Sequence, residues 1–192
     1  MNIIKKSNSG LQSLPIDSIL LLQRKIFLYD EITTESANLI LKQLIYLREE
    51  NNDPINIYIS SPGGEVNAGL MLYDQLKGMT DVTINMYCTG IAASMAAIIL
   101  AGGKKGNRFI LPHSKVMIHE PLIAGRGVTG SATSIQQTAE SIMETKKIMS
   151  ELLARDTGRS VDEIIDAISY DHYMNATEAI KFGIVDAIVQ KI

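Results

Sequence analysis

Apolar residues recur along most of the chain with two periods, one typical of helices and one typical of strands. Residues 37–47 carry apolar side chains three or four positions apart, behind Thr33 or Thr34, either of which can cap a helix. Residues 55–59 alternate between apolar and polar positions, as in a strand. Strands separated by helical segments predict an α/β fold, with a mainly parallel sheet covered by helices.

The same patterns predict the remaining elements. Residues 82–87 alternate as a strand, Thr89-Gly90 interrupts the pattern, and residues 91–100 then read as a helix. Although residues 82–103 are uncharged, this helix is too short to cross a bilayer, so we expect no membrane segment. Further strands are expected at residues 26–28, 109–111, 116–118 and 184–189, and further helices at 66–76, from Ser160 onward, and between Asn175 and Gly183.

The longest predicted helix covers residues 131–155, with apolar side chains near a seven-residue repeat and Gly158 as its stop. A helix of that length reaches roughly 37 Å at 1.5 Å per residue. We therefore expect part of it to project from the domain and to pack on another subunit. Residues 1–13 are expected to form a flexible N-terminal segment, and residues 14–192 a single domain.

Composition and charge exclude several classes of function. The 192 residues include 18 Lys and Arg against 21 Asp and Glu, so nothing in the net charge of −3 favours a nucleic-acid partner. The single cysteine, Cys88, excludes an intramolecular disulfide and an all-cysteine metal site. No signal-peptide pattern opens the chain, so a cytoplasmic location is expected.

The first candidate for chemistry is Ser94, which follows a strand and opens a helix among small residues, Gly-Ile-Ala-Ala-Ser-Met-Ala-Ala. A helix N-terminus presents free N–H groups to a developing oxyanion, and small neighbours leave room for substrate. The alternative is that Ser94 only caps an alanine-rich core helix. The segment alone leaves both open.

Two other segments could complete such a site. The turn Ser61-Pro62-Gly63-Gly64 allows close approach of a substrate backbone and offers an N–H for an oxyanion hole, or it is simply a strand-to-helix turn. His119 ends an apolar run, which makes it a better candidate base than His113 or His172. The orienting carboxylate cannot be chosen from spacing, because triads are defined by geometry, and Asp171 is one possibility.

The glycines after His119 form a third feature. Gly125, Gly127 and Gly130 lie between His119 and the long helix. This stretch is either a surface loop or a segment that pairs with an extended peptide by adding a strand to it.

Several motifs together resemble the Clp protease family of serine peptidases. They are Ser-Pro-Gly-Gly at 61–64, Gly-Ile-Ala-Ala-Ser-Met-Ala at 90–96, Arg-Phe-Ile-Leu-Pro-His-Ser at 108–114, Val-Met-Ile-His-Glu-Pro at 116–121 and Phe-Gly-Ile-Val-Asp at 182–186. The resemblance runs from about Leu20 to Ile192. It implies the αββ superhelix shared with crotonases, with the long helix as a handle between rings.

The resemblance also implies roles for individual residues. Ser94 is the expected nucleophile, His119 the general base and Asp171 the acid that orients it. The backbone N–H groups of Gly64 and Met95 are the expected oxyanion hole. Gly63, Gly125 and Gly127 are the expected substrate-binding residues.

The expected assembly is a homo-oligomer of two stacked heptameric rings, without metal or cofactor. It would degrade unfolded polypeptides delivered by an AAA+ unfoldase such as ClpX, ClpA or ClpC. Two alternatives are a weakly active or structural Clp subunit that needs a partner ring, and a crotonase-like acyl-CoA hydratase.

The chain departs from the family pattern at several positions. Glu120 stands where the family usually has Gln, in His-Gln-Pro. Ser169-Tyr170 replaces the acid and arginine that commonly precede the catalytic Asp and form a contact between rings. Asn56 replaces a Tyr of the pocket that docks the ATPase, whereas Tyr58 matches. We therefore expect ring pairing to depend more on the long helix.

Overall fold

The computed structural model describes residues 1–7, 10–123 and 127–192. One sheet of seven strands organises these residues, with strand order β3-β4-β5-β6-β9 and with β7 placed between β5 and β8. Every pairing in this sheet is parallel except that of β7 with β8. The strands are β3 (Lys25–Tyr29), β4 (Ile55–Ser61), β5 (Ile84–Ala93), β6 (Arg108–Ile110), β7 (Lys115–Ile118), β8 (His172–Asn175) and β9 (Ala187–Ile188). The predicted α/β class with a mainly parallel sheet is confirmed.

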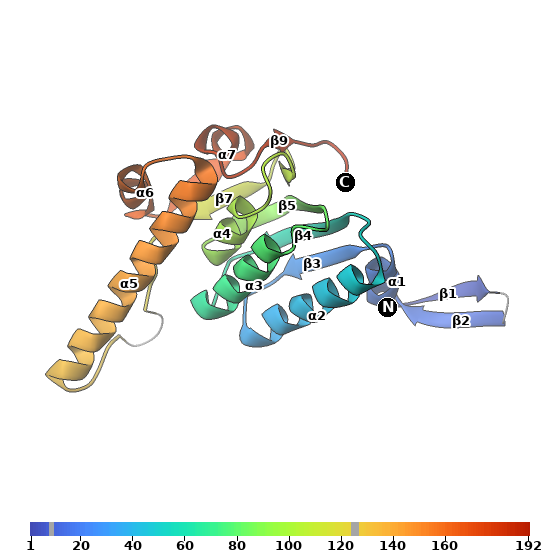
Figure 1. The fold of residues 1–192 in the computed structure, drawn as a ribbon, viewed down its shortest axis with the longest axis horizontal. Helices are drawn as coiled ribbons and strands as arrows, with labels where there is room; N and C mark the ends of the chain where they lie inside the picture. Colours follow the sequence, from blue (N-terminus) through green and yellow to red (C-terminus); the bar gives the residue numbers. More distant parts are fainter. Residues whose placement is uncertain (8–9, 124–126) are drawn as a thin grey trace.

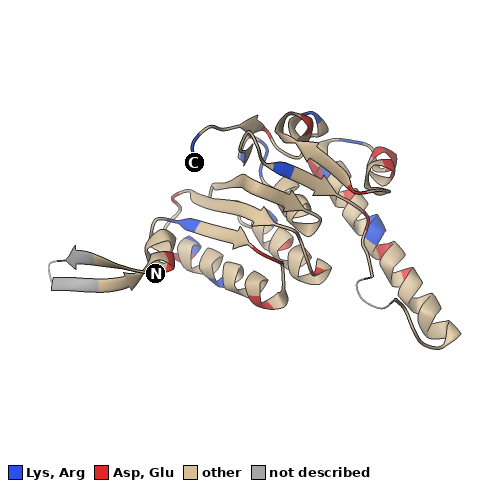
Figure 2. Ribbon diagram, turned by 180° about the vertical axis from the view of Figure 1, so that it is seen from behind, with Lys and Arg blue, Asp and Glu red and all other residues tan. Residues whose placement is uncertain are grey.

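Helices α2, α3 and α4 lie side by side over one face of the sheet (Figure 1). Seen from behind, the strands stand in front of these helices (Figure 2). An aromatic row crosses the sheet from β3 to β6, and its rings stack in the order Phe27, Tyr58, Tyr87 and Phe109. The described helices are α1 (Ile16–Leu22), α2 (Thr34–Glu50), α3 (Val66–Gly78), α4 (Met95–Ala101), α5 (Ala132–Thr157), α6 (Val161–Ile168) and α7 (Ala176–Phe182).

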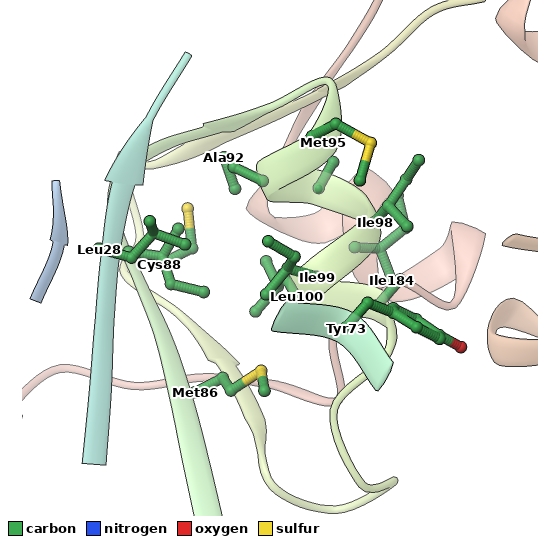
Figure 3. Close-up of a cluster of buried hydrophobic side chains, with 14 of the residues drawn as sticks. Leu28, Tyr73, Met86, Cys88, Ala92, Met95, Ile98, Ile99, Leu100 and Ile184 are labelled. Atoms are coloured by element: carbon green, nitrogen blue, oxygen red, sulfur yellow. The ribbon is translucent and has the colours of Figure 1, made fainter. Parts of the chain in front are cut away.

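The core is centred on α4, all of whose residues are buried. A helix that is apolar on every side is stable only when it is enclosed, and α4 is covered by the sheet and by neighbouring helices. Figure 3 shows its side chains among residues of β3, β5, α3 and the segment after α7, namely Leu28, Met86, Cys88, Ala92, Tyr73 and Ile184. This enclosure fixes the residue that precedes α4, which is Ser94.

Strand β5 differs from its prediction and determines the shape of the sheet. Its first half pairs with β6, through Met86 and Arg108, and its second half pairs with β7, through Ala92 and Val116. The helix predicted at 91–100 is therefore wrong for residues 91–93, which continue the strand, and α4 begins at Met95. Small apolar residues suit either structure, and here pairing with two strands decided in favour of the strand.

Several other predictions were confirmed or corrected. Thr33 caps α2 with a capping box, as expected. Helix α3 covers the predicted residues 66–76 and continues to Gly78, and it buries Ala68, Gly69, Leu72 and Tyr73. The strand predicted at 184–189 shortens to β9.

The N-terminal residues form elements that the pattern did not predict. Strands β1 (Asn2–Ser7) and β2 (Gly10–Pro15) pair antiparallel and are followed by α1. The flexibility expected for residues 1–13 and the domain boundary at 14 stay predictions.

Helix α5 is the longest described helix, and its two ends have different surroundings. Ser131 caps its start and Gly158 ends it in the left-handed conformation, with φ of 82°. Its buried residues, including Met149 and Leu153, belong to its C-terminal part. Figure 1 shows its N-terminal end lying away from the sheet. No helix in the described ranges has the length and apolar character needed to cross a membrane.

Candidate active site

The candidate residues gather at one edge of the sheet because three parallel strands end there. Strand β4 ends at the glycine turn, β5 ends just before Ser94, and β7 ends just before His119. Strand β8 runs antiparallel to β7, so the residue before it, Asp171, reaches the same edge. Residues at the carboxyl edge of parallel strands commonly form ligand sites, and here four separate segments meet.

Ser94 occupies a strained turn between β5 and α4. Its φ is 54° and its ψ is −124°, a backbone conformation that side-chain-bearing residues rarely adopt. Its N–H donates to the carbonyl of Met117 on β7 at 2.9 Å, which secures the turn beside that strand. Ser94 stands at the N-cap position of α4, but its hydroxyl makes no capping hydrogen bond. A sharp strand-to-helix turn that exposes a serine hydroxyl is the arrangement of known nucleophile elbows.

The glycine turn packs directly on Ser94. A Cβ added to Gly63 would lie 2.7 Å from the Cβ of Ser94, so only glycine fits this contact. The Gly63 carbonyl accepts from Ile32 N at 2.8 Å, and Glu65 N donates to Ile32 O at 2.8 Å. These two hydrogen bonds fix the residues before and after Gly64.

The backbone amides of Gly64 and Met95 have no acceptor within the described parts of the chain. Each belongs to a segment that is fixed by other contacts, since Gly64 lies between two bonds to Ile32 and Met95 opens the buried α4. Free, fixed N–H groups are what an oxyanion hole requires. The oxyanion role predicted for them stays a prediction.

His119 and Asp171 face each other across the end of the β7–β8 ladder. Ile118 pairs with His172, which places the next residue of β7 opposite the residue before β8. The distance from His119 Nδ1 to Asp171 Oδ1 is 4.0 Å, longer than a hydrogen bond. The His119 side chain is 15% exposed and that of Asp171 is 64% exposed. No hydrogen bond joins Ser94 to His119 within the described ranges.

An aromatic stack flanks Asp171, which the sequence interpretation missed. The rings of Tyr170 and His172 stack at 5.4 Å, and His172 meets Phe182 edge-on at 5.6 Å. Asp171 lies between these two ring residues in sequence, and its carboxylate faces His119. The alternation of Tyr170 and His172 around the acid was the available signal.

Cys88 and the two remaining histidines have different surroundings. Burial raises the pKa of the Cys88 thiol to about 11, so it is protonated at neutral pH and a poor nucleophile. His113 is exposed in the turn between β6 and β7. The Nδ1 of His172 is buried without a partner in the described chain.

A groove of about 750 Å³ begins next to this edge. It lies between the start of α3 at Glu65, residues 121–123 after His119, and one face of α5 that includes Ile142. Of the glycines expected to bind substrate, Gly63 lies at the site, Gly127 is exposed with φ of 88°, and Gly125 lies outside the described residues. This groove adjoins the site on the side of Glu65 and Pro121.

No group of three or more metal-ligating side chains occurs in the part of the chain that the structure describes. In comparison with known protein families, the Clp protease family model matches residues 8–192.

Proposed function

The chain belongs to the Clp protease family, and we propose that it is a serine endopeptidase with Ser94 as its nucleophile. Family membership establishes a ClpP-like peptidase. The serine mechanism rests chiefly on one observation, the strained turn of Ser94 at the edge where His119 also lies. The match to the Clp protease family also favours a peptidase over an acyl-CoA hydratase.

In the proposed mechanism, His119 removes the hydroxyl proton as Ser94 Oγ attacks the scissile carbonyl carbon. The oxygen of the tetrahedral intermediate accepts hydrogen bonds from the amides of Gly64 and Met95. His119 then gives the proton to the leaving amine, and water hydrolyses the acyl-enzyme by the same steps. Asp171 stabilises the imidazolium that forms in each half of the reaction.

The 4.0 Å between His119 and Asp171 gives the weakly active alternative a physical basis. An N–H···O bond needs about 2.7–3.2 Å, so the pair must close by about 1 Å. A chain that cleaves slowly until a partner ring or an ATPase closes this distance is therefore our second proposal. Purified protein assayed alone and with its unfoldase distinguishes the two.

Family membership implies an oligomer and an ATPase partner. We propose the specific form expected from the motifs, a cytoplasmic particle of two stacked heptameric rings fed with unfolded polypeptides by an AAA+ unfoldase. Large apolar side chains exposed on α5, among them Ile135, Met143 and Ile148, support a contact between subunits there.

The decisive experiment is covalent labelling of the protein with a fluorophosphonate, followed by mass spectrometry of its peptides. An activated serine reacts with this probe, so the adduct should be found on Ser94 and be absent from Ser94→Ala. Ser18→Ala, which changes an exposed serine of α1, is the matched control and should label normally. Labelling elsewhere, or hydration of crotonyl-CoA without peptide cleavage, would overturn the proposal.

A further inference from the structure

Glu120, the residue directly after His119, is held at two points. Its N–H donates to the carbonyl of Ile168 on α6 at 2.8 Å. Its carboxylate Oε2 pairs with Lys146 Nζ on α5 at 2.6 Å. The segment that carries the candidate base is therefore tied to two helices, through main chain on one side and side chain on the other.

The Glu120–Lys146 pair is more than a solvated surface contact. The two side chains are 41% and 23% exposed, so both charges are partly withdrawn from water and less screened by salt. The next residue on the same helix offers a comparison. Lys147 lies 3.9 Å from Glu151 and its side chain is 75% exposed, which is the geometry of a surface pair of little consequence.

His119 lies between two fixed points of the backbone. On its N-terminal side the β7–β8 ladder ends at Ile118, and on its C-terminal side Glu120 is the next fixed point. His119 Nδ1 is 4.0 Å from Asp171 Oδ1, so a shift of about 1 Å decides whether their hydrogen bond forms. Misplacement of that size can cost on the order of 10²-fold in rate.

We propose that Lys146 and Glu120 are positioning residues, whose ion pair sets the place of His119 relative to Asp171. This inference rests on the proposed serine mechanism. It assigns to α5 a direct part in the site, because a movement of the middle of α5 carries Lys146, Glu120 and His119 with it. The pair touches neither substrate nor the reacting atoms.

The test is steady-state cleavage of a short fluorogenic peptide by the full-length assembled protein. Glu120→Gln and Lys146→Met each remove one charge with little change of shape, and the double variant completes a mutant cycle. Lys146→Arg keeps the charge. Lys147→Met is the matched control, because it removes a neighbouring charge of α5 that does not reach Glu120.

We expect each single variant to lower kcat by about 10-fold with KM little changed, since a part of the 10²-fold cost of a full 1 Å displacement is incurred. The double variant should be no slower than either single variant, because the same tie is lost once. Lys146→Arg should retain most of kcat, and Lys147→Met all of it. Fluorophosphonate labelling of Ser94 should slow in parallel.

Wild-type kcat in both single variants, or losses that simply multiply in the double variant, would overturn the inference. If Lys146→Met does not fold, as judged by circular dichroism and particle mass, Glu120→Gln decides alone, because it preserves the side-chain shape. Failure of the proposed function is distinguishable, since in that case Ser94→Ala itself still cleaves the peptide.

Discussion

The contact between Gly63 and Ser94 provides the sharpest test of the site, through the substitution Gly63→Ala. Two effects follow from the added methyl group. The new alanine would have to adopt a φ of 92°, which lowers the free energy of unfolding by about 1–2 kcal/mol. The methyl carbon would also lie 2.7 Å from Ser94 Cβ and 2.7 Å from Ala93 O, where ordinary carbon contacts need about 3.5–4.0 Å.

Gly106→Ala separates these two effects. Gly106 has φ of 93°, almost identical to that of Gly63, but an added Cβ there meets nothing within 4 Å. In both variants the alanine at positive φ should lower the free energy of unfolding by this backbone cost. Only Gly63→Ala must displace Ser94, by roughly 1 Å, and a displacement of that size costs about 10²-fold in kcat/KM.

The assay is peptide hydrolysis by both variants, combined with chemical unfolding. We expect Gly106→Ala to cleave at the wild-type rate and Gly63→Ala to be about 10²-fold slower. Wild-type cleavage by Gly63→Ala would show that the position of Ser94 does not matter for activity. Equal losses in both variants would show that backbone strain, rather than the contact with Ser94, controls activity.

Two further predictions concern stability and assembly. Asp186→Asn should lower the free energy of unfolding by about 3 kcal/mol, because it leaves the buried guanidinium of Arg108 without its carboxylate, and denaturant titration measures this. Burial by itself raises the pKa of Asp186, but the hydrogen bonds and the charge of Arg108 hold that pKa below its usual value. Wild type should therefore lose this stability as the pH falls below about 4, and a similar acid loss in Asp186→Asn would refute the assignment. Met143→Glu, at a side chain 62% exposed on α5, should separate paired rings in analytical ultracentrifugation, whereas high salt should leave wild-type rings paired; an unchanged mass in the variant places the ring contact elsewhere.

Local signals predicted the helices that begin with a side-chain cap, because caps depend on a few neighbouring residues. Thr33, Ser131, Ser160 and Asn175 each cap the expected helix through its side chain. Residues 91–93 were predicted wrongly because their small apolar side chains have no period that separates strand from helix. Their structure was determined by pairing with Ser61 of β4 and with β7, both more than 20 residues away in sequence.

The three residues of the proposed triad could be predicted from the sequence to different extents. Ser94 and His119 stand out from their immediate context, at the start of a helix and the end of an apolar run. Asp171 could be selected only through the family resemblance, because its approach to His119 depends on the register of β7 and β8. The Lys146–Glu120 pair spans 26 residues and had no local signal at all.

The contacts around the three members of the proposed triad differ in kind. Ser94 is held by backbone contacts, namely the close packing of Gly63 on its Cβ and the hydrogen bond from its N–H to the carbonyl of Met117. Asp171 is flanked by the stacked rings of its two sequence neighbours, Tyr170 and His172. His119 is linked to α5, the helix whose far end lies away from the sheet, through the ion pair of Glu120 with Lys146. A subunit or ATPase that shifts α5 would therefore change the alignment of the base while leaving the nucleophile and the amides of the oxyanion hole in place, so such a partner should change kcat more than KM.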